Sequence, residues 1–466
     1  MEVIGILLSL FLLMYFAYRG FSVILFAPIF ALLAAVSQGF SVMPSYTELF
    51  MGKAVGYVKA YFPVFILGAV FGKVIEDTGM AKSISQAIVR AVGKGKPQAI
   101  IAIAITGIVL TYGGVNTMVA VFAIYPFGCA LFREVGIPKR LLPAAILFGA
   151  GTVTMDAFPG TPQIQNLIPT TYFGTNAYAA PINGILGGLL VLGLCFAWLK
   201  WRVDQSGEEG YGEGHTNEPI ESNNFEPLDW RLAVIPLVTV LVLNYVMTRL
   251  FYWDPNLLLP FQSMKLPMVA ASIKNVIAIW SLIIAESVAI CLALLIGFKN
   301  IKGGGKLAKT LNAGAVGSLL AVMNVASEVG YGNVIASLPG FSSIANFLFS
   351  IKMGNSPLLS EAVTVNVLAG ITGSASGGMS IALDIMGKEW LSMANAIGLS
   401  PEMLHRVASM ASGGMDTLPH NGAIITVLAV CGLTHKQSYF DIFAVTVCKT
   451  FAAFMIIVFY SLTGLL

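Results

Sequence analysis

Long runs of apolar residues recur along the whole chain, and they constrain its fold more than any other feature. The clearest runs, which contain few or no charged residues, are Val3–Phe16, Val23–Val36, Tyr61–Val74, Ile185–Leu199, Leu232–Met247, Leu282–Phe298 and Phe440–Leu462. Several approach the roughly 20 residues that a helix needs to cross a bilayer. Only 11% of the 466 residues are charged, whereas a soluble domain carries about 25%. The sequence therefore predicts an integral membrane protein.

The same runs indicate the type of secondary structure. Lipid supplies no water to backbone groups, so spanning segments must be helices or strands of a closed barrel. Continuous apolar runs without two-residue alternation favour helices. We expect an all-α polytopic protein with two repeats of about five or six transmembrane helices each. The start, Met1-Glu2-Val3, lacks the basic flank of a cleavable signal, so the first run is expected to remain as the first helix.

A hydrophilic stretch near the middle of the chain, Arg202–Asp229, is rich in Glu, Gly and Asn. It is typical of a linker. We therefore predict a first transmembrane repeat over residues 1–200, a linker over 201–230 and a second transmembrane repeat over 231–466. If the halves are related, segments of the first should recur in the second at a constant offset.

Four pairs of segments meet that expectation, in the same order. Gly72-Lys73-Val74-Ile75 recurs as Gly332-Asn333-Val334-Ile335, with an offset of 260 (332 − 72 = 260). Met155–Pro159 matches Met415–Pro419 at the same offset. Gly136 matches Gly398, and Gly113-Gly114 matches Gly377-Gly378, at offsets that differ by a few residues. The chain is therefore predicted to be a duplication, a design that recurs in secondary transporters.

Polar interruptions of the apolar segments fall at matching places in the two halves: Thr111–Thr117, Met155–Gln163, Thr372–Ser380 and Met415–Gly422. Glycine permits unwound backbone and proline ends a helix, so each break should leave half-helix ends inside the membrane. Such ends can bind an anion and a coupling cation. Close helix packing at small residues is the alternative. The predicted substrate-binding residues are Gly113, Gly114, Asn116, Thr117, Ser374, Ser376, Gly377, Gly378, Ser380, Thr417, His420 and Asn421.

Ionisable and amide groups at membrane depth are candidates for coupling to an ion, because burying them unpaired costs several kcal/mol. We predict this role for Asp156, Glu328, Asn333, Asp416 and His420. For the two aspartates, capping of the next helix is the alternative. Histidine suits proton exchange, but His420 could also bind a substrate carboxylate. The residues leave open whether the ion is a proton or sodium.

Other ionisable residues receive structural interpretations. Glu361 is expected to begin a helix, where the dipole favours a carboxylate, and Glu286 could lie at a helix interface or a helix end. His215, His405 and His435 are expected to be solvated. The five cysteines are interpreted as packing residues, since they lack metal or redox spacing. No metal or cofactor is expected, and a net charge of +3 without a basic stripe argues against nucleic acid.

Three second-half segments resemble the gluconate permease family, and more narrowly its hydroxybutyrate permease branch within the ion transporter superfamily. They are Ser327–Asn333, Gly370–Gly378 and Asp416–Gly422. The resemblance implies a proton symporter for small hydroxy-carboxylates, such as 3-hydroxybutyrate, in the bacterial cytoplasmic membrane. It also implies inverted repeats, paired re-entrant hairpins, a homodimer and alternating access.

Rival functions are weighed against this expectation. An enzyme would need a nucleophile with a base, a metal cluster or a suitably placed carboxylate pair, and none stands out. A channel needs a continuous pore more than two gated half-sites. Among carriers, a sodium-coupled organic-anion symporter and a gluconate-type sugar-acid permease remain the alternatives. We therefore expect the partners to be a small organic anion, a proton or sodium ion, the lipid bilayer and a second copy of the chain.

Overall fold

The computed structural model describes residues 2–19, 21–93, 95–115, 117–214, 228–303, 305–350, 356–419 and 421–466. Almost all of these residues are helical, and no strand is found among them. The elements of the first half are α1 (Glu2–Tyr18), α2 (Val23–Ser37), α3 (Val42–Pro44), η1 (Ser45–Phe50), α4 (Met51–Asp77), α5 (Met80–Val92), α6 (Lys96–Tyr112), α7 (Thr117–Val135), η2 (Lys139–Leu141), α8 (Leu142–Ala150), α9 (Val153–Asp156), α10 (Ile164–Phe173) and α11 (Pro181–Gln205).

The second half repeats this order of long and short helices. Its elements are α12 (Trp230–Tyr245), η3 (Val246–Leu250), η4 (Pro255–Leu258), α13 (Leu259–Ser263), η5 (Ile273–Asn275), α14 (Ile277–Ile301), α15 (Lys306–Ser337), α16 (Phe341–Ser350), α17 (Leu358–Thr372), α18 (Ala375–Ala396), α19 (Pro401–Ser412), α20 (Gly422–Cys431) and α21 (His435–Thr463). In this order α4 corresponds to α15, α6 to α17, α7 to α18, α8 to α19, α10 to α20 and α11 to α21.

Within the described ranges, six helical segments are long and apolar enough to cross a membrane: Val42–Asp77, Pro181–Gln205, Trp230–Leu250, Ile277–Ile301, Lys306–Ser337 and His435–Thr463. Five shorter apolar segments accompany them: Val3–Leu13, Val23–Ser37, Lys96–Tyr112, Leu358–Gly370 and Gly422–Cys431. The all-α membrane fold is confirmed. The helices beside the breaks, α8, α10, α19 and α20, are each too short to cross a bilayer alone.

The two halves contact each other reciprocally. Helix α10 of the first half packs on α18 and α19, while α20 of the second half packs on α7 and α8. The contact of α14 with α4 corresponds to the contact of α2 with α15. The contact of α12 with α5 corresponds to the contact of α1 with α16. These contacts between unlike elements therefore occur in mirrored pairs, as a two-fold relation between the halves predicts.

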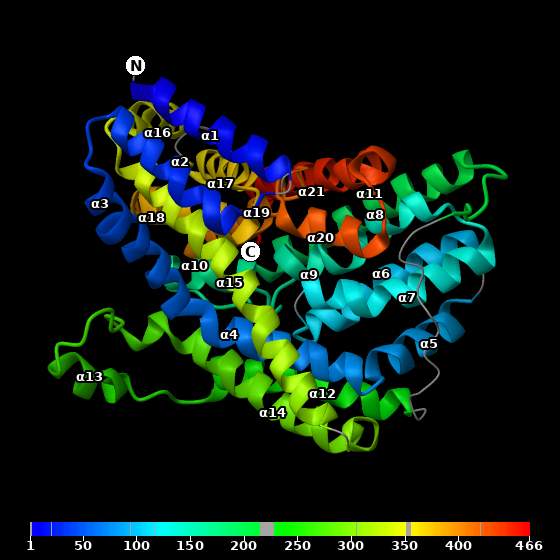
Figure 1. The fold of residues 1–466 in the computed structure, drawn as a ribbon. Helices are drawn as coiled ribbons and strands as arrows, with labels where there is room; N and C mark the ends of the chain where they lie inside the picture. The colour runs from blue at the N-terminus through cyan, green and yellow to red at the C-terminus, as the bar shows by residue number, and fades with distance from the viewer. Residues whose placement is uncertain are drawn as a thin grey trace.

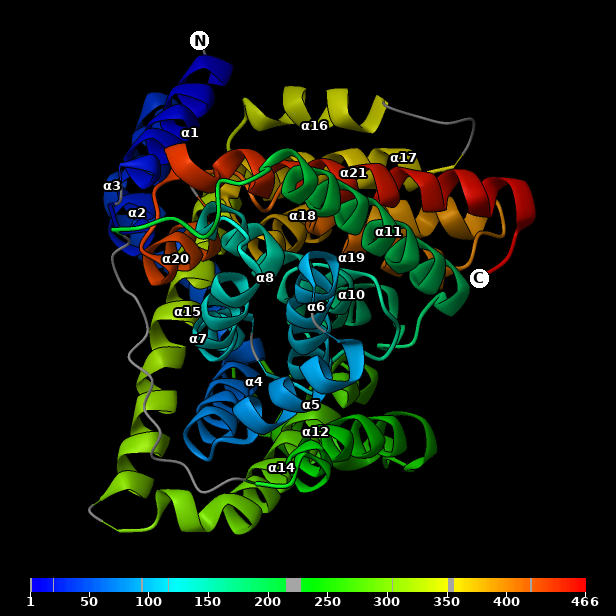
Figure 2. The same ribbon diagram turned by 90° about the vertical axis from the view of Figure 1, so that its right-hand side faces the viewer.

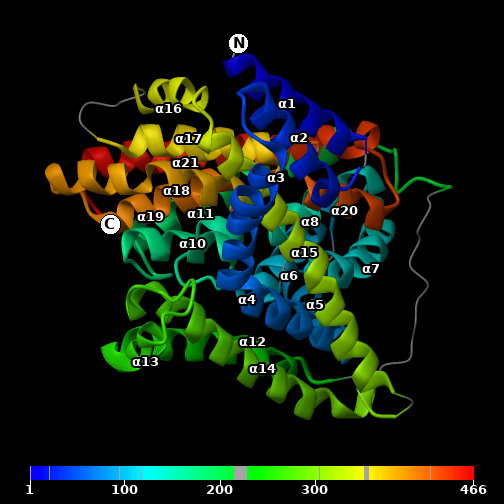
Figure 3. The same cartoon turned by 60° about the vertical axis from the view of Figure 1, so that its left-hand side comes forward.

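Helices α4 and α15 pack along each other through the middle of the molecule, with α1 and α2 at one end and α12 and α14 at the other (Figures 1 and 3). The broken helices, α6 to α10 and α17 to α20, together with α11 and α21, form a second body beside this frame (Figure 2). The four breaks thus come together from distant parts of the sequence.

One of the four matched segments needs correction. Gly113 is the residue that ends α6, and the residue that ends α17 is Gly373, not Gly377. Gly377 and Gly378 lie in the first turn of α18. The sequence match paired two glycine doublets because they look alike. The helix ends give an offset of 260 (373 − 113 = 260), which two of the other three segments also show.

The hydrophilic stretch begins inside α11, which continues to Gln205. Just beyond it, Glu209 accepts hydrogen bonds from Arg140 at 2.9 and 2.8 Å. The hydrogen-bonded guanidinium lowers the pKa of the Glu209 carboxyl. Residues 215–227 lie outside the described ranges, and Asp229 caps the start of α12. The described parts of the linker are therefore hydrogen-bonded to the first half through Arg140 and to the second half at the start of α12.

Candidate functional site

Two aspartates from corresponding breaks meet at one lysine in the interior. Lys449 of α21 places its Nζ 3.0 Å from Asp156 Oδ2 and 3.3 Å from Asp416 Oδ1. The same Nζ donates to the Gly151 carbonyl at 2.8 Å. All three charged side chains are buried, and a buried carboxylate is stable only when it is paired or protonated. Lys449 therefore joins the second break of each repeat at a single ion-paired centre.

Arg406 of α19 gives the first repeat a second buried cation. Its side chain is fully buried, and it donates to the Ala157 carbonyl at 2.8 Å and to the Ala179 carbonyl at 2.7 Å. The neighbouring Ser409 donates to the carbonyl of Asp156 at 2.7 Å. Side chains of the second repeat thus satisfy backbone carbonyls that the first repeat frees where its helix breaks.

The other first-repeat break is satisfied from within the same repeat. The Gln163 amide donates to the carbonyls of Thr111 and Val115 at 2.7 and 3.1 Å, and the Tyr112 hydroxyl donates to the Pro159 carbonyl at 2.7 Å. These carbonyls were expected to be available to a cation. Since protein donors already occupy them, they are poor candidates for sodium ligands in this conformation.

Glu328 of α15 lies against the start of α18. Its side chain is 6% exposed, its Oε2 has no hydrogen-bond partner among the described residues, and the Ser374 hydroxyl lies beside the carboxylate. A Cβ built on Gly377 would lie 3.0 Å from that Oε2. Ser374 caps α18 by accepting from the Gly377 N–H at 3.1 Å. The carboxyl thus faces the N-terminal turn of a 22-residue helix.

Two further buried polar atoms, one on α4 and one on α18, lack a partner in the described part of the chain. One is the hydroxyl of Tyr57 on α4, which lies near Ser376 and Glu328, and the other is the hydroxyl of Ser380, one turn further along α18 than Ser376. Buried polar groups are nearly always hydrogen-bonded, so unpaired ones need an explanation. Together with Glu328 they indicate a site that a polar ligand would complete.

The predicted substrate-binding residues lie in several different environments. Ser374, Ser376, Gly377 and Ser380 gather at the start of α18, whereas Gly113 and Gly114 lie under α12 side chains in the first repeat. Gly378 packs against the α17 backbone at Ala369, as close helix packing predicts. Asn116 and His420 lie outside the described residues.

The remaining predicted residues have structural partners. Thr117 donates to the Ala150 carbonyl, and Thr417 is hydrogen-bonded to Thr446. Asn421 caps α20 by accepting from Ala423 and Ile424, and Asn333 donates to Val329 in its own helix. The residue at the N-cap of α10 is Gln163. Neither Asp156 nor Asp416 therefore occupies the N-cap of the helix that follows it, and their predicted coupling role stays a prediction.

Several other expectations change. His405 is fully buried rather than solvated, with hydrogen bonds to Thr175 and Asn166. Among the cysteines, Cys291 is exposed on the surface of α14. Glu361 does lie in the first turn of α17, as expected. Sequence reasoning missed Lys449 and Arg406, although a lone lysine inside the apolar run Phe440–Leu462 is itself a signal of function or pairing.

Gly413 leaves room for the ion-paired centre, which allows a direct test. An alanine Cβ there would overlap Asp156 Oδ2 and lie 2.7 Å from Lys449 Nζ. We expect Gly413→Ala to destabilise the protein by about 1–3 kcal/mol, the usual cost of overpacking, seen as a lower melting temperature in detergent. Gly422→Ala is the control, because nothing lies within 4 Å of its added carbon. Equal melting of both variants would contradict the close packing at this centre.

Comparison with known proteins agrees with this architecture. Residues 1–351 match the family described as GntP family permease. The "Uncharacterized transporter YxjC" of Bacillus subtilis (strain 168) is 49% identical over 478 residues, which cover 100% of each chain. An "Uncharacterized permease" of Haemophilus influenzae is 24% identical over 81% of this chain and 82% of its own length. The solved YdaH transporter of Alcanivorax borkumensis shares the fold, with a TM-score of 0.55, 15% identity and coverage of 94% and 98%.

Proposed function

Because the chain belongs to the GntP family of permeases, we propose that it imports a small hydroxy-carboxylate by proton symport with alternating access. Family membership makes it a multi-pass membrane transporter and not an enzyme, as the sequence predicted. The substrate class and the coupling ion are the proposal. One observation carries it: a buried, unpaired carboxyl oxygen of Glu328 faces the first turn of α18.

The start of α18 has the chemistry of a carboxylate site. The first N–H groups of a helix lack partners within the helix, and the positive potential that they create at the helix N-terminus attracts an anion. Ser376 and Ser380 add hydroxyl groups on the same helix. A substrate with one carboxylate and one hydroxyl, such as 3-hydroxybutyrate, matches this combination of donors.

The position of Glu328 links anion binding to protonation. An ionised carboxylate next to the substrate carboxylate would repel it, and both charges would be costly to bury. Once protonated, Glu328 becomes a hydrogen-bond donor to the anion. Binding of the anion and of one proton therefore favour each other, which is the thermodynamic requirement for symport.

A proton fits the breaks better than sodium does. Sodium coordination needs several backbone and side-chain oxygens around one point, but Gln163, Tyr112, Arg406 and Lys449 already donate to the freed carbonyls of the first repeat. No cluster of three metal-binding acidic, histidine or cysteine side chains occurs among the residues that the structure describes. Sodium coupling and a gluconate-type substrate remain the alternatives that the experiment below separates.

The body of broken helices is proposed to move against the frame of α1, α2, α4, α12, α14 and α15. Glu328 belongs to the frame and the first turn of α18 to the moving body, so the motion would open or close the space between them.

The halves are proposed to be inverted repeats, with the linker at 201–230 between them. We also propose that the protein lies in the bacterial cytoplasmic membrane, since both similar relatives are bacterial. A homodimer is proposed as its assembly, and cross-linking in native membranes tests it.

Uptake into liposomes tests the proposed function. With the purified protein, labelled 3-hydroxybutyrate should accumulate when an inward proton gradient is imposed and should not accumulate with a sodium gradient alone. An excess of unlabelled gluconate should compete weakly. Accumulation driven only by sodium would overturn proton coupling, and uptake of gluconate in preference to hydroxybutyrate would overturn the substrate class.

A further inference from the structure

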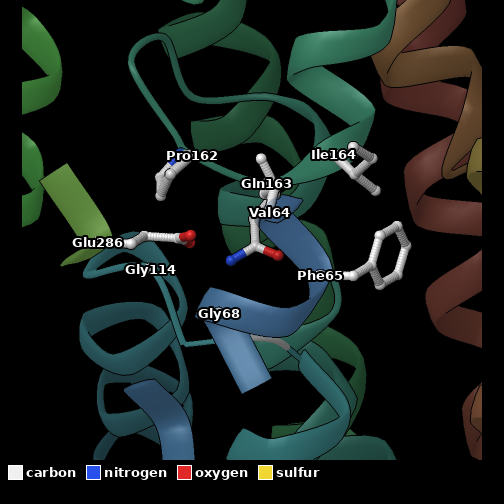
Figure 4. Close-up of a pocket in the computed structure, with 8 residues that line it drawn as sticks. All are labelled: Val64, Phe65, Gly68, Gly114, Pro162, Gln163, Ile164 and Glu286. Atoms are coloured by element: carbon white, nitrogen blue, oxygen red, sulfur yellow. The ribbon is translucent and has the colours of Figure 1, made fainter. Parts of the chain in front are cut away.

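A pocket in the first repeat contains a second isolated carboxyl. The pocket is lined by Val64, Phe65, Gly68, Gly114, Pro162, Gln163, Ile164 and Glu286. Figure 4 shows the Glu286 side chain reaching into it from α14, toward the Gln163 amide. The Glu286 side chain is 2% exposed, and its Oε2 has no hydrogen-bond partner in the described ranges.

Among the described residues, no charge compensates this carboxyl. Helix α14 packs against α4, α12, η3, η5, α10 and α15. The residues that these elements and the breaks bring to the pocket are apolar or glycine, apart from the neutral Gln163, and no charged or titratable described residue lies near enough to act on Glu286. A permanently ionised carboxylate would be very costly here. The site must therefore hold a proton in at least part of any working cycle.

Glu286 occupies, in the first repeat, the place that Glu328 occupies in the second. Position 68 of α4 corresponds to position 328 of α15 at the offset of 260 (328 − 68 = 260). It is glycine, and a Cβ built on Gly68 would lie 3.3 Å from Glu286 Oε1 and 3.7 Å from the Gly114 carbonyl oxygen. The missing side chain at Gly68 is thus replaced by a carboxyl that comes from another helix.

The two carboxyls also face corresponding breaks. Gly113 ends α6 as Gly373 ends α17, so Gly114 corresponds to Ser374. Glu286 shares the pocket with Gly114, and Glu328 lies beside Ser374. Both glutamates belong to the frame, while both breaks belong to the body of broken helices. Any movement between frame and body would change the surroundings of both carboxyls.

We propose that Glu286 is a second proton-binding site, the first-repeat counterpart of Glu328, so that each chain carries two exchangeable protons, one facing each repeat. Its role in transport rests on the proposed symport, but protonation of the carboxyl does not. The second proton would let a monovalent anion enter with net positive charge, so that the membrane potential contributes to uptake.

Infrared difference spectroscopy of the purified protein in liposomes tests this site without any substrate. Protonated and ionised carboxyls absorb at different frequencies, so a buried group that titrates gives a band that changes between about pH 5 and pH 10. We expect Glu286→Gln to remove one such band, Glu328→Gln to remove another, and the double variant to remove both. Glu48→Gln, an exposed glutamate, should leave the bands unchanged.

Two results would overturn the inference. One is a Glu286→Gln spectrum that matches the wild-type spectrum, and the other is a Glu286 band that never changes with pH, as a permanently neutral packing group would give. Gly68→Ala should shift the pH at which the Glu286 band changes, because its methyl group would press on the carboxyl. Uptake driven only by sodium would refute the proposed symport yet leave the titration intact, so the two failures are distinguishable.

Discussion

Replacing Lys449 by methionine is expected to destabilise the protein more than Gly413→Ala does. The ammonium group is the cation within ion-pair distance of both Asp156 and Asp416. Removing one partner of a buried ion pair typically costs about 3–5 kcal/mol, because the remaining charge stays buried without compensation. Here two carboxylates lose their partner together. The melting temperature and the yield of monodisperse protein in detergent measure the effect.

Two companion variants show whether unpaired charge is the cause. Lys436→Ala removes an exposed lysine from the start of the same helix and should leave stability unchanged. The neutral combination Asp156→Asn, Asp416→Asn and Lys449→Met removes all three charges, and buried ion pairs can often be replaced by neutral groups at little cost. It should therefore be more stable than Lys449→Met alone. If the combination is less stable, the loss comes from packing and not from the uncompensated aspartates.

The duplication and the positions of the breaks could be predicted from the sequence because both are local signals. Glycine, proline and short polar residues act on the backbone where they occur, and the repeat shows as matching segments such as Met155–Pro159 and Met415–Pro419. The doublet Gly377-Gly378 misled the match because glycine serves two purposes. Gly373 adopts a positive φ of 68° to end a helix, whereas Gly378 gives room for a neighbouring backbone.

The partners of the buried charges could not be predicted in the same way. Lys449 follows Asp416 by 33 residues and reaches Asp156 from the other repeat, so no spacing rule connects them. Arg406 gives no local signal of burial, because a basic residue in the segment after Gly398 looks like part of a polar loop. The sequence does not fix the place of Glu286, since its surroundings come from α4 and from two first-repeat breaks. Each case depends on how the two halves contact each other.

Glu328→Gln is expected to abolish accumulation of substrate while leaving exchange across the membrane. Glutamine can still donate a hydrogen bond to a substrate carboxylate at the start of α18, but it cannot release a proton. The carrier would then return only with substrate bound, so a proton gradient could no longer drive net uptake. In liposomes, the ratio of internal to external labelled substrate should fall to about one. Exchange of labelled for unlabelled substrate at equal concentrations should continue.

The exchange measurement separates this mechanism from simple loss of binding or folding. Glu328→Asp keeps the ionisable group and should retain part of the accumulation, whereas Glu389→Gln, on the exposed face of α18, should behave as wild type. Undiminished accumulation by Glu328→Gln would remove this carboxyl from the coupling mechanism. Because Glu286 would still carry a proton in that case, the combined Glu286→Gln and Glu328→Gln variant then decides whether either carboxyl couples proton movement to transport.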